Sequence, residues 1–524
     1  MTPVLNLKSH LGGRWVERGG APGETLVNPA TEEPLASVGG GAIDGKAALA
    51  FARTRGGAAL RALTFAKRGA LLGGMGKALQ AHRDELLDLS VRSGGNTRGD
   101  AKFDVDGAIF TLAAYAEIGQ GLGEATFLVD GEGITLGRSP RFHGQHIAVP
   151  RLGVAVHINA FNFPAWGLAE KAAVALLAGV PVLSKPATSS ALLAHRIVEI
   201  LLEKQVLPEG ALSLLVGPVG DLLEHLGPQD VVAFTGGSDT GLKIRSLPQV
   251  LRNSVRVNVE ADSLNAAVLG PDAAPGSETY AFFLKDVLRD MTQKAGQKCT
   301  AIRRVLAPAP LAARVRDDLV DELGRITVGD PAHDGVRMGP LATASQLRDV
   351  REGVSALAAD GRLVFGVSEV VALGATPGKG FFFSPALIEV EPGADAPAVH
   401  GREVFGPVAT VVPYSGRPGE AAEIVARGGG GLVASVYSED AAFTVDVVLG
   451  LAPFHGRVFL GSARIAEQSP GPGTVLPSLV HGGPGRAGGG EELGGPRGLA
   501  FYLQRVALEG SRPIIEKIAG VKSS

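Results

Sequence analysis

Val154-Ala155-Val156-His157-Ile158 is the stretch that decides the fold, because it is a short apolar run of the kind that forms a buried strand. A helical stretch from Trp166 to Leu177 follows it, and then comes a second apolar run, Val180-Pro181-Val182-Leu183-Ser184. The alternation continues with expected strands at 212–216, 231–234 and 255–259 and expected helices at 191–203, at 221–226 and from about 238. Strands that alternate with helices predict a parallel sheet with crossover helices, so the fold class is α/β.

Polar residues gather where these strands end. They are Asn159 to Asn162, Lys185, Thr235 to Ser238 and Glu260. In parallel sheets ligands bind at the carboxyl ends of the strands, so we expect the functional site at this edge.

The turn Phe234-Thr235-Gly236-Gly237-Ser238 joins a strand to a helix and offers free amides and a positive helix end to a phosphate. Ser238 stands where a full dinucleotide fingerprint has its middle glycine. A plain strand-to-helix turn is therefore the alternative. If the turn does bind a dinucleotide, Glu260, 19 residues after Gly241, would be the ribose ligand.

The chain has a single cysteine, Cys299, in the run Lys294-Ala295-Gly296-Gln297-Lys298-Cys299-Thr300. One thiol cannot form an intramolecular disulfide. It could be a small buried hydrophobe, as free cysteines often are, but its polar neighbours do not make an apolar socket. A thiol beside a lysine and open backbone amides can lose its proton and attack carbon, so Cys299 is the candidate nucleophile.

Two further residues fit this chemistry. Glu260 follows an expected strand, and a carboxylate at the sheet edge can activate the thiol or a water. Asn162 could donate its amide N–H to an oxygen that becomes negative, with the backbone N–H of Cys299 as the second donor. Taken alone, Glu260 could equally be a solvated or ion-paired carboxylate, and Asn162 an ordinary turn residue.

Length and composition narrow the class of protein. A chain of 524 residues predicts two or three domains, and 45% hydrophobic with 20% charged residues is typical of a globular enzyme. The net charge of −3 gives no reason to expect nucleic acid or a membrane surface as a partner. The first residues have no apolar core, so we expect no signal peptide, and the run from Ala172 to Leu183 is too short to span a bilayer. The single thiol fits a reducing cytoplasm.

Other segments complete the outline. Helical periodicity runs from about Thr64 to Arg92, and a long helix from Tyr280 to Lys294 leads to the cysteine loop. The glycine-rich segment from His481 to Gly490 is, on composition alone, a linker or a flexible surface loop. Arg303 and Arg304 are typical of solvated surface arginines.

Together these residues resemble the aldehyde dehydrogenase superfamily from about Leu11 to Gln504. The matching motifs are Asn28-Pro29-Ala30-Thr31, Asn162-Phe163-Pro164, Lys185-Pro186, Phe234-Thr235-Gly236 with Gly241, Glu260, Gly296-Gln297-Lys298-Cys299 and Glu403-Val404-Phe405-Gly406-Pro407. The resemblance implies a thiohemiacetal on Cys299, hydride transfer to a nicotinamide, and hydrolysis of the thioester by a water that Glu260 activates. It also implies that Lys185, Thr188, Gly217, Thr235, Gly236, Gly237, Ser238, Glu403 and Phe405 bind the cofactor, that Glu260 is no ribose ligand, and that no metal takes part.

Departures from the common family pattern indicate one particular branch of the superfamily. Glu260 is followed by Ala261-Asp262-Ser263-Leu264-Asn265 instead of Leu-Gly-Gly-Lys, and it lies 39 residues before Cys299, a few more than usual. With the glycine-rich segment, these features resemble the dehydrogenases of aerobic aromatic degradation through CoA thioesters. The phenylacetate enzyme of that group carries a C-terminal hydratase domain, for which we expect no room before Ser524. We therefore expect the benzoate branch, with 3,4-dehydroadipyl-CoA semialdehyde as the substrate.

The turn after Lys185 bears on the cofactor. Many NAD-dependent members of the family carry a Glu three residues after this lysine, where this chain has Thr188. A carboxylate there would repel a 2′-phosphate, whereas a hydroxyl can donate to it, so we expect a preference for NADP over NAD. A simple helix-capping role is the alternative for Thr188.

The resemblance also implies a domain organisation. We expect a Rossmann-like cofactor-binding domain at 1–130 and 150–274, a catalytic α/β domain at 275–480, and an oligomerisation flap with a C-terminal tail at 131–149 and 481–524. The flap should pair with a strand near Ala500 to Leu508 and support a homodimer. Alternative functions are oxidation of phenylacetate-pathway or simple aldehydes, acylating reduction with free CoA, and a dinucleotide-binding protein without catalysis.

Overall fold

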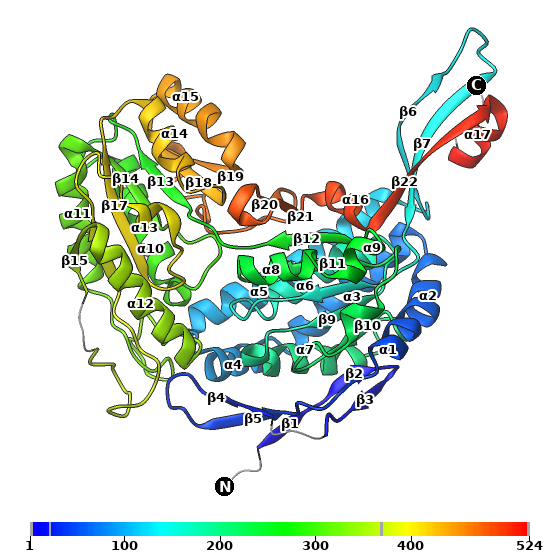
Figure 1. Ribbon diagram of the computed structural model, residues 1–524, viewed down its shortest axis with the longest axis horizontal. Helices are drawn as coiled ribbons and strands as arrows, with labels where there is room; N and C mark the ends of the chain where they lie inside the picture. Colours follow the sequence, from blue (N-terminus) through cyan, green and yellow to red (C-terminus); the bar gives the residue numbers. More distant parts are fainter. Residues whose placement is uncertain (1–3, 20–22, 367–369, 521–524) are drawn as a thin grey trace.

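The computed structural model describes residues 4–19, 23–366 and 370–520 and contains two seven-stranded sheets (Figure 1). The first sheet has the order β12 (Arg256–Glu260), β11 (Val231–Thr235), β8 (Ala155–Ile158), β9 (Val182–Lys185), β10 (Leu212–Leu214), β2 (Ser9–Leu11) and β3 (Arg14–Val16). The five strands from β8 to β12 are parallel, which confirms the α/β prediction. The antiparallel strands β2 and β3 extend this sheet at one edge and were not expected from the sequence.

Helices cover this sheet because their apolar residues face it. Two of them, α6 (Trp166–Leu177) and α7 (Ala191–Glu203), have the predicted bounds, and α6 is buried along almost its whole length. The other long helices of this half are α3 (Phe65–Ala81), α4 (Arg83–Gly94) and α5 (Arg98–Leu122). The single helix predicted from Thr64 to Arg92 is wrong, since the chain leaves the helical conformation at His82 and begins α4 directly after it.

The second sheet has the order β15 (Arg362–Phe365), β16 (Ala386–Glu389), β17 (Val408–Tyr414), β14 (Arg304–Pro308), β13 (Ala266–Leu269), β18 (Gly431–Tyr437) and β19 (His455–Gly461). It is parallel apart from β15. Around it lie α10 (Glu278–Thr292), α11 (Ala309–Leu323), α12 (Ala344–Asp360), α14 (Pro418–Ala426) and α15 (Ala441–Leu451). Because β13 pairs with β14 and β18, the chain changes sheets between β12 and β13, before the expected boundary at residue 274.

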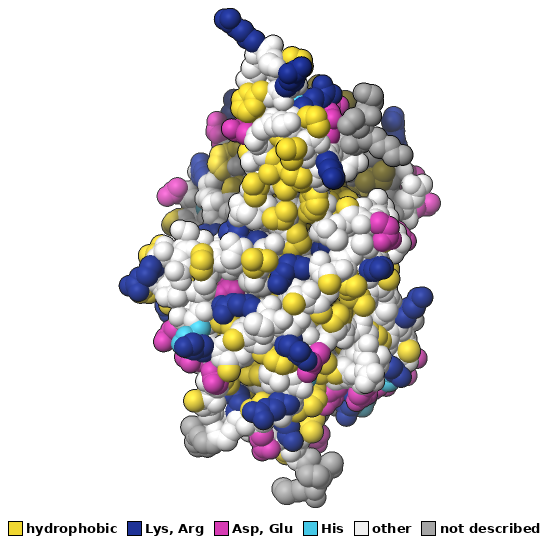
Figure 2. Space-filling model, turned by 90° about the vertical axis from the view of Figure 1, so that its right-hand side faces the viewer, with side chains coloured by type: hydrophobic (Ala, Val, Ile, Leu, Met, Phe, Trp, Pro, Cys, Tyr) yellow, Lys and Arg dark blue, Asp and Glu magenta, His cyan; other side chains and the backbone are white. Residues whose placement is uncertain are grey.

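A three-stranded sheet projects from the body of the molecule (Figure 1). It consists of β6 (Leu128–Thr135), β7 (Phe142–Pro150) and β22 (Leu503–Ser511), and the expected pairing of the flap with the C-terminal strand is present from Leu503 to Ser511. Hydrophobic side chains gather on this side of the molecule, with Ile134, Phe142 and Ile514 about half exposed (Figure 2). The last predicted tail residues, 521–524, lie outside the described residues.

The glycine-rich segment is an ordered hairpin and not a linker. Its strands are β20 (Val480–Gly483) and β21 (Gly490–Leu493), which pair antiparallel beside β12. Gly488, between them, has φ +101°, and a Cβ there would lie 2.2 Å from the carbonyl oxygen of Val259. Glycine is therefore required for the hairpin to approach the end of β12 so closely.

None of the helices in the described part of the chain is both long enough and apolar enough to cross a membrane.

Candidate active site

The ends of the parallel strands meet as the sequence predicts. Lys185, Thr235 and Glu260 are the last residues of β9, β11 and β12, and Thr235 lies opposite Glu260 in the ladder. The Thr235 hydroxyl donates to Glu260 Oε2 at 3.4 Å. The predicted site edge therefore exists, with the glutamate buried at 2% exposure.

The cysteine loop follows α10 in an unusual backbone conformation. Lys294, Ala295 and Gly296 have φ of +53°, +52° and +68°, and left-handed conformations of this kind cost energy in residues other than glycine. At Gly296 a Cβ would lie 2.1 Å from the carbonyl oxygen of Gly406. This close approach requires glycine directly before Gln297-Lys298-Cys299.

Buried donors hold this loop in place. Arg303 donates to the carbonyl oxygens of Gly296 at 2.9 Å and Lys298 at 3.2 Å, and Asn265 Nδ2 donates to the carbonyl of Cys299 at 2.8 Å. The prediction that Arg303 and Arg304 are solvated is wrong, because they are 4% and 1% exposed and bind backbone carbonyls. Arg303 anchors the cysteine loop, whereas Arg304 binds the carbonyls of Leu264, Ile424 and Val425. Buried in this way, neither arginine is available to an extended substrate at the surface.

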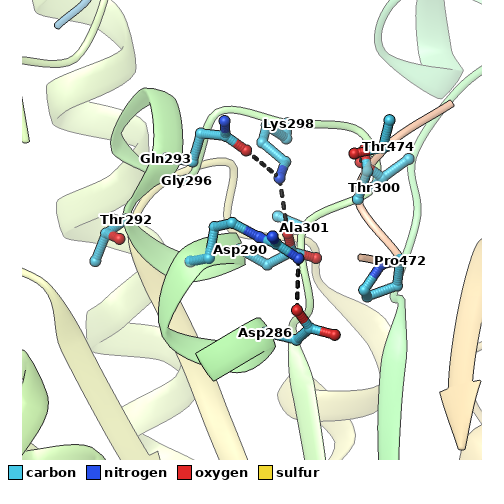
Figure 3. A network of polar contacts seen from close by, with 12 residues as sticks. Asp286, Asp290, Thr292, Gln293, Gly296, Lys298, Thr300, Ala301, Pro472 and Thr474 are labelled. Carbon is cyan, nitrogen blue, oxygen red and sulfur yellow. Dashed lines mark hydrogen bonds and ion pairs between the residues drawn. The ribbon is translucent and has the colours of Figure 1, made fainter. Parts of the chain in front are cut away.

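Lys298 is not the charge partner of the thiol, although it precedes Cys299 in the chain. Figure 3 shows its side chain directed toward Gln293 and Asp290, with Nζ 2.9 Å from the Gln293 amide oxygen and 2.7 Å from Asp290 Oδ1. The lysine and aspartate side chains are 1% and 0% exposed. The expectation that this lysine helps the thiol to lose its proton is therefore wrong.

The thiol instead lies beside Glu260 and a histidine that the sequence analysis missed. His481 Nε2 is 3.2 Å from Glu260 Oε1 and 3.9 Å from Cys299 Sγ. One nitrogen, oxygen or sulfur atom from each of the three side chains lies within 4.8 Å of the other two. The glycine hairpin brings His481 there, 182 residues after the cysteine. The only sequence signal was a histidine at the head of a glycine cluster, which is too weak to indicate a site.

Electrostatics in this cluster follow from its burial. Burial opposes ionisation of Glu260, but the charge and hydrogen bond of His481, with Lys171 nearby, outweigh it and lower the pKa to about 2. Burial also lowers the pKa of His481, but the negative charge of Glu260 raises it further, so the net shift is upward. Burial and the neighbouring Glu260 raise the pKa of the Cys299 thiol well above its ordinary value. Glu260 therefore favours the protonated form of His481 and opposes ionisation of the thiol, while His481 favours the ionised form of Glu260.

Asn162 lies at the same place, in the loop after β8. Its Nδ2 donates to the carbonyl of Gln297 at 3.1 Å, and its side chain lines cavities on both sides of Cys299. A side-chain amide nitrogen has two hydrogens, so one remains for an oxygen in the cavity.

One cavity, of about 500 Å³, runs along the strand ends to Cys299. Of the predicted cofactor-binding residues it is lined by Lys185, Thr235, Gly236, Gly237, Glu403 and Phe405. Thr188, Gly217 and Ser238 do not line it. Thr188 directly follows the lining residue Ala187, and among the described residues its hydroxyl has no hydrogen-bond partner and caps no helix. Gly217 packs against Val38.

Glu403 fits a ligand with hydroxyl donors. Its Oε2 accepts from the backbone N–H of Ser263 at 3.1 Å, whereas its buried Oε1 has no hydrogen bond within the described chain and lies 3.6 Å from Arg303. Burial raises its pKa to about 7, although the charge of Arg303 opposes the shift. A ribose hydroxyl would supply the donor that Oε1 lacks.

A second set of cavities reaches Cys299 from the other side. A small one contains Cys299, Glu260 and His481, and it shares Phe103, Trp166, Gly473 and Val475 with an outer cavity of about 520 Å³. The outer cavity adds apolar surface at Phe110 and Leu476 and cations at Lys102 and Arg289. Cys299 thus lines both the cavity along the strand ends and the small cavity, and the small cavity borders the outer one.

Comparisons with known proteins agree with this arrangement. A model of the aldehyde dehydrogenase family matches residues 15–506. The chain is 47% identical over 481 residues to a 3,4-dehydroadipyl-CoA semialdehyde dehydrogenase of Aromatoleum evansii, an alignment that covers 92% of this chain and 93% of that protein. Its fold is similar to betaine aldehyde dehydrogenase from Staphylococcus aureus in complex with NAD+ (TM-score 0.81, 24% identity, 97% of this chain and 95% of that one). It is also similar to 3,6-anhydro-L-galactose dehydrogenase in complex with NAP (TM-score 0.83, 21% identity, 97% and 100%).

Proposed function

The chain belongs to the aldehyde dehydrogenase family, and from this premise we propose that it oxidises 3,4-dehydroadipyl-CoA semialdehyde to the acid, with NADP as the preferred acceptor. The observation that carries the proposal is that Cys299 lines two cavities, one along the strand ends and a small one that it shares with Glu260 and His481 and that borders the outer cavity. The 47% identity to the Aromatoleum evansii enzyme supports the choice of substrate.

The residues around Cys299 suit the reaction step by step. The thiol of Cys299 loses its proton to solvent and adds to the aldehyde carbon, and the new oxyanion accepts from the second N–H of Asn162. When bound, the nicotinamide supplies the hydride acceptor that turns the adduct into a thioester. Glu260 then takes a proton from a water that attacks the thioester carbon. The carbon–sulfur bond breaks, and the acid leaves.

The cavity along the strand ends suits the cofactor. Glu403 Oε1 offers an acceptor to the nicotinamide ribose, and Lys185 lies where the adenosine ribose is expected. Support for NADP comes from Thr188, whose hydroxyl has no hydrogen-bond partner among the described residues and where no carboxylate would repel a 2′-phosphate. Both domains would contribute to the site, with Lys185, Thr235 and Glu260 from the cofactor-binding domain and Cys299, Glu403 and Phe405 from the catalytic domain.

The outer cavity suits the CoA end of the substrate. Its volume of about 520 Å³ is in the range of small-molecule sites, and its apolar wall at Phe103, Phe110 and Trp166 fits a long flexible arm. Lys102 lies among these lining residues and could face a phosphate, whereas Arg289 is paired with Asp286, and Asp106 and Asp290 add negative charge to the same lining.

We infer that the protein is a homodimer through the projecting sheet of β6, β7 and β22. Ile134 of β6 and Phe142 of β7 are about half exposed on this sheet. Hydrophobic side chains gather on this side of the molecule (Figure 2). Exposed apolar residues on a projecting element are typical of an interface.

The proposed function is tested by following cofactor reduction by absorbance, with 3,4-dehydroadipyl-CoA semialdehyde as substrate and NADP or NAD as acceptor. The same semialdehyde without CoA and a simple aliphatic aldehyde are the controls, and Cys299→Ala should be inactive with all of them. We expect the highest kcat/KM with the thioester and NADP. Equal or better turnover of the aldehydes that lack CoA would refute the substrate assignment.

A further inference from the structure

His481 has no part in the reaction described above, yet its ring lies between the two groups on which that reaction depends. Nε2 is 3.2 Å from Glu260 Oε1 and 3.9 Å from Cys299 Sγ, and the side chain is 3% exposed. A buried polar side chain in contact with both a candidate nucleophile and a candidate base is well placed to set their charge states.

The geometry fixes which way the proton on the ring points. A nitrogen 3.2 Å from a carboxylate oxygen carries a hydrogen and donates it, so Nε2 is a donor to Glu260. Nε2 is therefore not free to take the thiol proton of Cys299. His481 acts through Glu260, and its role differs from that of the histidine in a cysteine–histidine pair.

We propose that His481 is a positioning residue that keeps Glu260 ionised and directed at Cys299, so that the buried carboxylate is ready to take a proton. The proposal rests on the proposed function only in taking Glu260 as the base of thioester hydrolysis. In that step the water O–H bond breaks, the proton binds the carboxylate, and the water oxygen bonds to the acyl carbon as the sulfur leaves as a thiolate. His481 keeps its own proton throughout.

Other charged groups also face this pair, since Glu170 and Glu492 each place an oxygen within 4.8 Å of a Glu260 oxygen. Lys171 on α6 lies 3.2 Å from Glu170 on the same helix and 2.9 Å from Glu492 on β21, opposite His481 in the hairpin. Arg457 on β19 donates to the carbonyl oxygens of Pro472 and Thr474. Among the described residues, His481 is the one cation in hydrogen-bond contact with Glu260. Its net upward pKa shift, caused by Glu260 against the effect of burial, supports the protonated form.

The hairpin that carries His481 is built for this approach. The next residue, Gly482, has φ +149°, and a Cβ there would lie 2.0 Å from the carbonyl oxygen of Gly490. On the other strand, Asn258 of β12 accepts from the backbone N–H of Glu491 at 2.9 Å. These contacts tie β20 and β21 to the strand that ends in Glu260, so the distance between the ring and the carboxylate is set by backbone geometry.

The test uses p-nitrophenyl acetate, which acylates a reactive thiol without any cofactor or aldehyde. The burst of nitrophenolate measures acylation of Cys299, and the steady rate measures hydrolysis by the Glu260-activated water. His481→Gln keeps an amide donor for Glu260 but removes the positive charge. Without that charge the pKa of Glu260 should rise, so the steady rate should gain an inflection at the new pKa. The rate should fall about tenfold for each pH unit below that inflection and should recover above it. The burst should remain.

Controls separate this role from a general loss of structure. His195→Gln removes another buried histidine whose Nδ1 lies 3.5 Å from a glutamate, Glu199, and it should keep the wild-type pH profile. Glu260→Gln should lose the steady rate at every pH. If His481→Gln has the wild-type profile, the proposal is refuted. If that variant does not fold, His481→Asn is the second variant.

The pH profile with His481 intact also tests the proposal. Between about pH 5 and pH 7 an ionised Glu260 does not change its charge, whereas the neighbouring Glu492 does, because burial raises the pKa of Glu492 to about 7. The steady rate should therefore show no acid limb in that range once Glu492 is replaced by Gln. An acid limb that persists in Glu492→Gln would overturn the proposal. Because no aldehyde is involved, these outcomes do not depend on whether the CoA semialdehyde proves to be the substrate.

Discussion

Replacing Lys298 with Met should destabilise the protein strongly while leaving the thiol chemistry nearly intact. The Nζ of Lys298 lies 2.7 Å from Asp290 Oδ1, both side chains are at most 1% exposed, and Asp290 Oδ2 has no hydrogen bond of its own within the described chain. Removing the lysine leaves an uncompensated buried carboxylate, which typically costs about 3–5 kcal/mol.

Urea unfolding at neutral pH measures this loss, with the double variant Lys298→Met with Asp290→Asn as the matched control. Since the double variant buries no unpaired charge, it should recover most of the lost free energy of unfolding. Iodoacetamide labels only Cys299 in this single-cysteine chain, so its rate against pH reports the thiol. The double variant should keep the wild-type labelling profile. A loss below about 1 kcal/mol in the single variant, or a labelling inflection shifted upward by about one unit in the double variant, would refute the reasoning.

Four other predictions concern the site. Asn162→Ala should lower kcat about 10²–10³-fold with little change in cofactor affinity, and a loss below about tenfold would move the oxyanion contact to another group. Glu260→Gln should give a burst of reduced cofactor without continued turnover in rapid-mixing experiments, whereas normal turnover would exclude it as the base. The pKa of Glu403 is raised to about 7, and the ionised carboxylate is the better acceptor for a ribose hydroxyl. Cofactor affinity measured by calorimetry should therefore rise as the pH increases through about 7, and Glu403→Gln should remove that dependence. Thr188→Glu should shift the ratio of kcat/KM toward NAD, and unchanged use of NADP would contradict the proposed basis of selectivity.

Much of the fold could be read from local patterns. The helices at 166–177 and 191–203 and the five parallel strands were predictable because their apolar pattern is complete within each segment, whereas the order of the strands in the sheet was not. The strand ends at Lys185, Thr235 and Glu260 were predictable as a site for the same reason. The break at His82 was not, because the helical period continues across it on both sides.

The charge environment of the thiol could not be read in the same way. Lys298 is adjacent to Cys299 in sequence, yet its side chain turns toward Asp290 near the C-terminal end of α10 (Figure 3). Its positive charge is therefore paired with Asp290 and not with the thiol. Arg303 was expected at the surface, although it is buried and binds the carbonyls of the cysteine loop. Neighbours in sequence do not determine which way a side chain turns, since the partner that fixes it lies on another element.

The sequence by itself determined the α/β class, the edge where the strands end, and the unique thiol at Cys299, because these depend on short-range pattern and composition. Only the tertiary structure decided that His481 meets Glu260 and Cys299, because a glycine hairpin carries it there from 182 residues away. It also decided that Glu260 is a low-pKa carboxylate while the thiol keeps its proton. Burial and the distances between charges set both, and neither exists until the chain has folded.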